Sequence, residues 1–261
     1  MVEDNAFGHC LFFYYDCLKV MIDNWLQRTE LLIGEEGIHR LSAAHVLVVG
    51  LGGVGAYAAE SLCRAGIGEL TLVDADRVEE TNLNRQLLAL TDTVGRAKTE
   101  VMAERLMRIH PEVKLHCHTV FVRDQYTHEL LSATPYDYVV DAIDTLSPKV
   151  FLLYEAVQMG LRVVSAMGAG GKLDPSKVQV ADISRTTQCR LAYSIRKRLH
   201  KMGVFSGFKA VYSTEPVREE SIRIDSDPTA NKLSTVGTIS YMPAIFGLTA
   251  AATVIQDLIE T

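Results

Sequence analysis

The amino-acid sequence predicts an α/β fold: a mostly parallel sheet covered by helices, followed by a C-terminal extension of mixed strands and helices. Short apolar runs alternate with stretches of helical periodicity, as parallel strands with helical crossovers require. A glycine-rich turn joins the first apolar run to the first such helix. The 261 residues show no repeat or linker and can bury a substantial core. We therefore expect one domain over residues 21–261, preceded by a poorly ordered extension over residues 1–20 that a true start at Met21 would remove.

Composition excludes several classes of protein. The formal charge of −6 excludes a strongly basic nucleic-acid-binding protein, although it permits a local basic patch, and no DNA partner is expected. Five cysteines in a chain of this length do not make a disulfide framework, and an odd number suits a reducing compartment. Residues 8–22 carry an acid and lack a small-residue cleavage site, so they are a poor signal sequence. These features predict a cytoplasmic protein.

The elements follow in order from apolar runs and helical periodicity. Ser147 is expected to cap a helix that has Pro148 in its first turn. Residues 236–256 carry no charge, but their glycines and proline favour a loop and a buried helix over a membrane span, with a peripheral membrane contact left open. Strands are expected at 46–49, 70–73, 113–122, 138–143, 162–166 and 178–183, a strand and loop at 203–227, and helices at 55–65, 96–109, 190–202 and 243–259.

The glycine turn predicts a nucleotide site. Gly50, Gly52, Gly53 and Gly55 lie between a strand and a helix start, where backbone N–H groups and the helix dipole attract phosphate. Asp74 ends the next strand, 19 residues beyond Gly55, where an acid accepts hydrogen bonds from ribose hydroxyls. This pattern alone leaves NAD and ATP open.

Polar residues beyond the second strand favour ATP. Asn82, Arg85 and Gln86 follow that strand, and Lys98 begins a later helix. Such a set can hold a triphosphate and stabilise a departing pyrophosphate, whereas an NAD-dependent oxidoreductase has no need of it. Asp144 lies at the end of another strand, where a carboxylate can hold Mg²⁺ against phosphates, while Asp141 is expected to be structural.

These motifs together resemble the E1-like adenylating enzymes, the ThiF/MoeB superfamily. The resemblance rests on residues 50–55 with Asp74, on 81–86, 93–98 and 141–144. It implies a Rossmann-like, E1-type fold, transfer of AMP to a carboxylate, and a homodimer in which Arg28 reaches the partner's ATP. A non-catalytic assembly module with the same fold is a weaker alternative. The roles implied by the resemblance place nucleotide contacts on Gly50, Gly52, Gly53, Gly55, Asp74, Asn82, Arg85, Gln86 and Lys98, magnesium on Asp144, and catalysis on Arg85, Lys98, Arg28 and Asp144.

Within this superfamily the sequence is most similar to the tRNA threonylcarbamoyladenosine dehydratases (the TcdA, or CsdL, group). The similarity rests on residues 28–34, 142–144, 165–175, 182–186 and 212–215. It implies that ATP and Mg²⁺ activate the carboxylate of the modified adenosine, which then cyclises with loss of water. A monovalent cation and a cysteine desulfurase or sulfur acceptor are further candidates. The alternative substrate is the C-terminal glycine of a ubiquitin-like sulfur carrier, which the absence of any C-x-x-C pair disfavours.

A basic segment is the candidate tRNA surface. Residues 183–214 contain seven bases and no acid, in a protein of net charge −6. On the helix within this segment, an apolar stripe opposes a basic face, which suits contact with a phosphate backbone or with solvent. The candidate tRNA-binding residues are Arg190, Arg196, Lys197, Arg198 and Lys201.

Two cysteine motifs are not expected to carry chemistry. Cys189 has no adjacent histidine to activate it as a nucleophile, so we expect it to have no catalytic role. In a strand, His116 and His118 face one side and Cys117 the other, which is poor geometry for three ligands to one metal. We expect this triplet to be structural.

Overall fold

A computed structural model describes residues 25–224 and 234–260. The expectations for residues 1–20 and Met21 lie outside this part. The sheet has seven strands in the order β3-β2-β1-β4-β5-β7-β6, parallel throughout except for β6 beside β7. Its strands are β1 (His45–Val49), β2 (Glu69–Val73), β3 (Lys114–His118), β4 (Tyr138–Asp141), β5 (Val163–Ala166), β6 (Val178–Asp182) and β7 (Lys209–Ser213), and β8 (Ile222–Ile224) pairs with β9 (Ser234–Val236).

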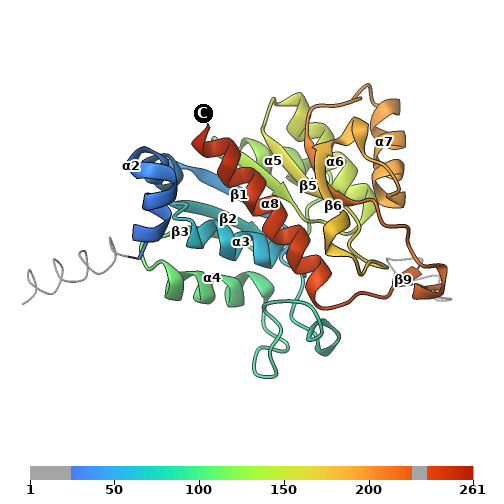
Figure 1. The fold of residues 1–261 in the computed structure, drawn as a ribbon, viewed down its shortest axis with the longest axis horizontal. Helices are drawn as coiled ribbons and strands as arrows, with labels where there is room; N and C mark the ends of the chain where they lie inside the picture. Colours follow the sequence, from blue (N-terminus) through green and yellow to red (C-terminus); the bar gives the residue numbers. More distant parts are fainter. Residues whose placement is uncertain (1–24, 225–233, 261) are drawn as a thin grey trace, which may run out of the picture.

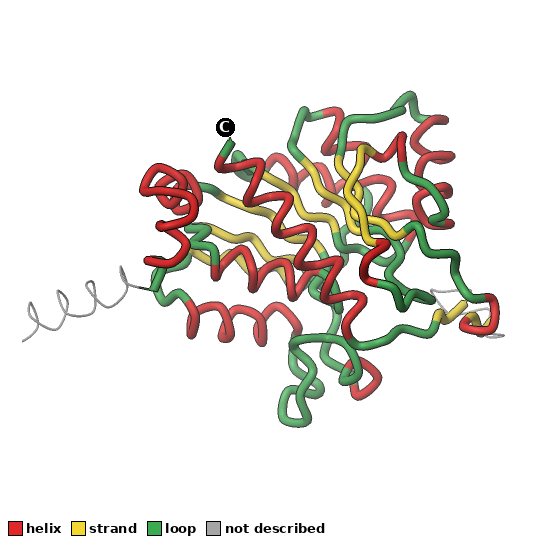
Figure 2. The backbone as a smooth tube through the Cα atoms, viewed as in Figure 1, coloured by secondary structure: helices red, strands yellow, loops and turns green. Residues whose placement is uncertain are grey.

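Helices cover both faces of this sheet (Figures 1 and 2). Val46 and Val48 of β1 pack with α2, α3, α4 and α8, whereas Leu47 and Val49 pack with α5, α6 and α7. Both faces are buried, which is why β1 reads as a continuous apolar run rather than an alternating one. The helices are α2 (Gln27–Ala43), α3 (Gly55–Arg64), α4 (Lys98–Ile109), α5 (Gln125–Ser132), α6 (Leu146–Gln158), α7 (Arg190–Lys201) and α8 (Tyr241–Ile259), with short 3₁₀ turns η1 (Glu80–Asn82), η2 (Pro175–Lys177), η3 (Ile183–Arg185) and η4 (Glu219–Ser221).

The uncharged C-terminal stretch forms a loop and then α8, as predicted. This helix crosses one face of the sheet beside α3 (Figure 1), and Phe246 and Val254 are fully buried beneath it. A side chain at Gly247 would begin 2.3 Å from the Val54 carbonyl oxygen, so the glycine permits the close approach to α3. Among the described residues, α8 is the one helix long and apolar enough to cross a membrane, and half of its most apolar window is buried.

Several boundaries differ from the prediction. The strand expected over 113–122 ends at His118, and α5 is the next element. The predicted strand is too long because Val122 is buried although it lies in a loop, so its apolar side chain resembles that of a strand residue. Helix α2 lacks a clear apolar stripe and contains a kink at Gly34, where φ is 75°, so periodicity did not predict it. Ser147 is not the cap of α6, because the helix begins at Leu146.

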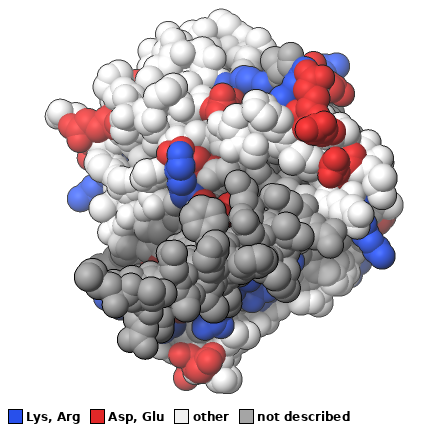
Figure 3. All heavy atoms as spheres, turned by 90° about the vertical axis from the view of Figure 1, so that its left-hand side faces the viewer, with Lys and Arg blue, Asp and Glu red and all other residues white. Residues whose placement is uncertain are grey.

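Acidic and basic side chains are mixed on the end of the molecule that bears α2. Figure 3 shows them there in small groups of both signs rather than in a single patch. Arg64 and Arg105 both contact Glu60, an example of such a group. The described part of this end, as Figure 3 shows it, bears no continuous basic surface.

Candidate functional site

The glycine turn after β1 is too tight for side chains at two positions. Gly50 has a φ of 92°, and a Cβ there would lie 2.8 Å from the Ala142 carbonyl oxygen. A Cβ on Gly55 would lie 1.7 Å from the Gly50 carbonyl oxygen. The turn therefore folds back on itself beside β4 and directs the N-terminus of α3 toward solvent, where its N–H groups and dipole can bind an anion.

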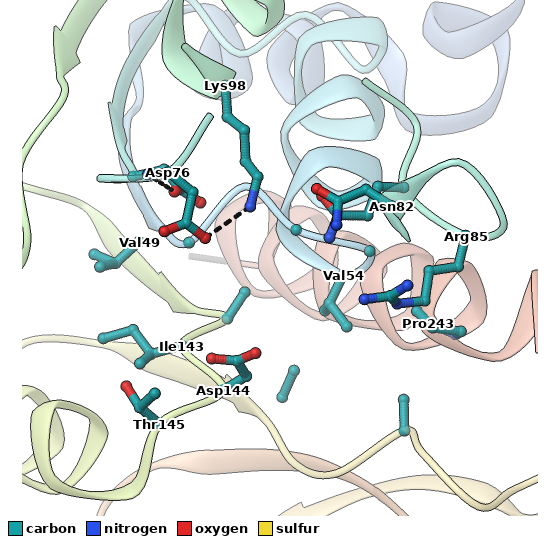
Figure 4. A pocket seen from close by; sticks show the side chains of 18 of the residues that line it. Val49, Val54, Asp76, Asn82, Arg85, Lys98, Ile143, Asp144, Thr145 and Pro243 are labelled. Carbon is teal, nitrogen blue, oxygen red and sulfur yellow. Dashed lines mark hydrogen bonds and ion pairs between the residues drawn. The ribbon is translucent and has the colours of Figure 1, made fainter. Parts of the chain in front are cut away.

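A cavity of about 680 Å³ opens over this turn, at the carboxyl ends of β1, β2 and β4 (Figure 4). Open parallel sheets bind ligands at this edge. The structure brings together most of the predicted nucleotide residues around the cavity, and Gly55 is buried beneath the turn. The predicted residues that line it are Gly50, Gly52, Gly53, Asp74, Asn82, Arg85, Gln86, Lys98 and Asp144.

Asp74 holds the glycine turn in place. Its carboxylate accepts hydrogen bonds from the backbone N–H of Leu51 at 2.6 Å and from that of Asp76 at 2.8 Å. Burial raises the pKa of this carboxyl group, and the charge of Lys98 opposes the shift. Asp74 thus fixes the loop geometry, in addition to lining the cavity as predicted.

Lys98 reaches the cavity from the first residue of α4. The start of α4 is attached to the segment after β2, because Lys98 N–H donates to the Asp76 carbonyl and Arg77 pairs with Ala97. The Lys98 side chain is buried, and its Nζ lies 2.8 Å from Asp76 Oδ2 (Figure 4). Asp76 was not predicted; its signal in the sequence is a second acid two residues after Asp74.

Arg85 and Asn82 lie on the opposite wall from Ile143 and Thr145 (Figure 4). Asn82 is buried at the end of η1, and its Oδ1 accepts a hydrogen bond from the Glu79 N–H at 3.3 Å. The Arg85 guanidinium donates to the Thr81 carbonyl at 2.9 Å and to Asn84 Oδ1 at 2.8 Å. These contacts orient a cation at the cavity without neutralising it, because neither of the two acceptors is a charged group.

Asp141 and Asp144 have different surroundings. Asp141 is fully buried and pairs with Lys149 at 2.7 Å and with Ser165 at 2.6 Å, which confirms the structural role expected for it. Lys149 Nζ also donates to the Ile143 carbonyl at 3.0 Å. Asp144 is exposed, and its carboxylate points into the cavity (Figure 4). The buried pair of Asp141 and Lys149 therefore fixes the turn after β4, from which Asp144 extends into the cavity.

The far wall comes from parts of the chain that local patterns do not connect with the glycine turn. Pro243 of α8 lies 3.0 Å from the position of a Cβ on Gly53, and the segment before α8 contributes Val236 and Thr238. Asn84 Nδ2 donates to the Thr238 carbonyl at 3.0 Å, which joins this segment to the Arg85 wall. Only long-range packing places these residues, so the sequence did not predict them.

Similarity to known proteins agrees with this arrangement of loop, acids and cations. Residues 26–261 match the ThiF family. The chain belongs to the ThiF family. It is 37% identical to the tRNA threonylcarbamoyladenosine dehydratase of Bacillus subtilis over 89% of this chain and 94% of that protein. It is 43% identical to the Escherichia coli protein of the same name over 75% of this chain and 76% of that protein. The E. coli enzyme TcdA in complex with ATP superposes with a TM-score of 0.81 at 38% identity, covering 91% of this chain and 96% of that one. The resemblance to E1-like ThiF enzymes, and to this group within them, is confirmed.

Some predicted residues of this ThiF-family chain lie away from the cavity. Arg28 is exposed on α2, beside Leu31 and Leu32, two residues that are 85% and 84% exposed. Cys189 is buried at the start of α7. Within the described part of one chain, Arg28 does not line the cavity.

The basic helix α7 presents four of its five candidate residues to solvent. Arg196 is the exception, because its guanidinium donates to the Thr186 carbonyl at 2.9 Å and to the Thr186 hydroxyl. It is half-buried and anchors the segment before α7, so it offers less surface to a tRNA than the other four candidates do. The exposed residues are Arg190, Lys197, Arg198 and Lys201.

Proposed function

We propose that the protein is a tRNA threonylcarbamoyladenosine dehydratase that uses ATP to activate the carboxylate of the modified adenosine. One observation carries the proposal. The glycine turn, Lys98, Arg85 and Asp144 surround a single cavity in a ThiF-family chain that matches dehydratases over most of both lengths. These full-length matches support the tRNA substrate over a ubiquitin-like sulfur carrier. ThiF membership likewise supports adenylation over NAD-dependent hydride transfer.

In this proposal the phosphates of ATP lie over the glycine turn at the N-terminus of α3, with the ribose toward Asp74. Lys98 and Arg85 supply positive charge from two sides of the cavity, where pyrophosphate would leave. A Lys98 contact with phosphate would replace its contact with Asp76, since Asp76 is solvent-exposed and can be rehydrated. Asn82 and Gln86 contribute amide groups to the same wall.

Asp144 is the proposed magnesium ligand. Its carboxylate enters the cavity from the carboxyl end of β4, and Mg²⁺ favours one or two carboxylates together with phosphate oxygens. Mg²⁺ bound there would neutralise charge on the phosphates. Lys149 positions this turn through the Ile143 carbonyl. A monovalent cation is a further candidate cofactor, with no site assigned to it.

The chemistry is written in two steps. A carboxylate oxygen of the substrate attacks the α-phosphorus of ATP, an acyl-adenylate forms and pyrophosphate leaves. A second atom of the same side chain then forms a bond to the acyl carbon and loses a proton. The bond from the acyl carbon to the adenylate oxygen breaks, and AMP leaves with that former carboxylate oxygen. The base therefore loses one water overall. No step needs an enzyme thiol, in keeping with the burial of Cys189.

A homodimer completes the proposed site. Arg28 would reach the ATP of the partner subunit, and the exposed Leu31 and Leu32 give α2 an apolar surface to bury against a second copy.

The exposed bases of α7 would contact the phosphate backbone of tRNA in the cytoplasm. A sulfur-transfer partner stays a candidate with no particular surface assigned to it.

Mass spectrometry of nucleosides tests the proposed reaction. Threonylcarbamoylated tRNA is incubated with the protein, ATP and Mg²⁺, digested, and examined for loss of one water from the modified adenosine. We expect the loss with the native protein, and no loss without ATP or with Arg85→Ala. An unchanged mass despite tight ATP binding would refute the tRNA substrate and favour a protein carboxylate.

A further inference from the structure

Two histidines and a glutamate meet at the end of the sheet opposite to the cavity. His45 is the first residue of β1, Glu69 is the first residue of β2, and His116 lies in β3. Parallel pairing sets His45 beside Glu69, and Thr71 beside His116. All four residues therefore share the face of the sheet that α5, α6 and α7 cover, because side chains alternate along each strand.

The potential ligand atoms are already close to one another. Glu69 Oε1 lies 2.8 Å from His116 Nε2 and 3.5 Å from His45 Nδ1. One ligand atom from each residue can be chosen so that all three lie within 4.8 Å of one another. Two ligands of a tetrahedral zinc ion at about 2.1 Å are separated by about 3.4 Å. Small rotations of these side chains would make room for an ion between them.

The surroundings of His45 suit a metal ligand. Its Nε2 lies 2.8 Å from the Thr71 hydroxyl, its backbone N–H donates to Asp137 Oδ2 at 2.7 Å, and its ring packs edge-on against Tyr136. With Nε2–H donating to Thr71, Nδ1 directs a lone pair toward the Glu69 carboxylate, and a cation between these atoms satisfies both. A hydrogen bond from the second ring nitrogen is the usual support for a ligating histidine.

We propose that His45, Glu69 and His116 form a site for a divalent transition metal of the zinc class. Two imidazoles and one carboxylate are ligands that zinc favours, and three protein ligands leave a fourth position for water. Half of the His116 side chain is exposed, which provides a path for the ion from solvent. Lys114 Nζ, 3.9 Å from Glu69 Oε2, is the competing cation, but its side chain is 75% exposed and can move away.

This site is independent of the proposed dehydratase reaction. It lies at the first residues of β1 and β2, whereas the cavity follows their last residues, about five residues or roughly 17 Å away along the strands. An ion bound here would tie β1, β2 and β3 together, so it would stabilise the edge of the sheet without contacting ATP. Its test therefore needs no enzymatic readout.

Binding of Co²⁺ and Zn²⁺ to the nucleotide-free protein tests the proposal. Co²⁺ in a tetrahedral site with nitrogen and oxygen ligands gives visible absorption bands, and Zn²⁺ displaces it; calorimetry then gives the affinity for Zn²⁺ alone. We expect one equivalent of Zn²⁺ to bind and to raise the melting temperature. His116→Ala and Glu69→Gln should each weaken binding by at least about tenfold, since even loss of an outer-shell partner costs that much at metal sites.

His128→Ala is the matched control. His128 Nδ1 also lies near a carboxylate, 3.1 Å from Glu155 Oε2, but it is not part of the three-residue cluster. We expect this variant to bind Zn²⁺ as the native protein does. Binding that persists in His116→Ala and Glu69→Gln, or no saturable binding to the native protein, would overturn the proposal. Because His116 and Glu69 are both partly exposed, these substitutions are compatible with folding, and circular dichroism checks it.

Discussion

Two buried lysines of this protein each pair with an aspartate, but the two pairs differ in their access to solvent. Lys149 and Asp141 are both fully buried, 2.7 Å apart, between β4 and α6. Lys98 has only 5% of its side chain exposed, whereas 69% of its partner Asp76 is exposed at the rim of the cavity, 2.8 Å away. One pair is sealed in the interior, and the other can exchange its acid for a ligand.

The difference separates structural support from binding. Breaking a sealed pair leaves a charge that water cannot reach, which is strongly destabilising. Breaking the open pair lets water solvate the aspartate, so the lysine can turn to phosphate at small cost. The sequence motif around each lysine does not distinguish these cases, because the distinction depends on what covers each aspartate.

The largest expected effect is on stability at the sealed pair. Lys149→Ala leaves Asp141 buried without its cation and should lower the free energy of unfolding by about 3–5 kcal/mol. Urea denaturation measures this effect. Lys177→Ala, which removes an exposed pair with Asp174, is the control and should change stability by less than about 1 kcal/mol. Equal losses in both variants would contradict the comparison.

The next effect is on catalysis at the open pair. Lys98→Ala should lower kcat/KM for ATP by about 10²–10³-fold, the usual cost of losing one group that stabilises transition-state charge. AMP release in the presence of modified tRNA measures it. Lys98→Met keeps most of the buried volume and should lose as much activity with less loss of stability. Full activity in Lys98→Met would contradict the phosphate role.

A smaller effect is expected within the sealed network. Ser165→Ala removes the hydroxyl that donates to Asp141 Oδ2 at 2.6 Å, while Lys149 and the Ile143 N–H still contact this carboxylate. We expect a loss of stability of about 1 kcal/mol, typical of one hydrogen bond, in urea denaturation. A loss as large as that of Lys149→Ala would show that the hydroxyl, not the ammonium group, satisfies Asp141.

The smallest effect has the opposite sign. Asp76→Asn removes the competitor of phosphate for Lys98, and because Asp76 is largely solvated we expect this pair to be worth no more than a surface ion pair, about 0.2–1 kcal/mol. ATP should therefore bind tighter by no more than about fivefold, measured by calorimetry with a non-hydrolysable analogue. Weaker binding would show that Asp76 contacts the nucleotide itself or orders Lys98 for it.

The amino-acid sequence was enough to predict the alternation of strands and helices, the glycine turn and nine of the residues that line the cavity. These features rest on local patterns: alternation along a strand, the periodicity of a helix, and the position of a polar residue directly after an apolar run. Asp74 and Asp144 follow strands, so their place at the edge of the sheet was predictable. The structural role of Asp141 was also predictable, although its partner Lys149 was not.

Which residues of distant elements meet depends on the tertiary packing of those elements. The wall formed by Pro243 and Thr238 depends on the packing of α8 across the sheet, and the contacts of Arg196 depend on the segment before α7. His116 lies beside His45 and Glu69 because strand order and register bring three separate strands together. The short-range periodicity that defines an element contains no information about its neighbour, and burial and pairing depend on that neighbour.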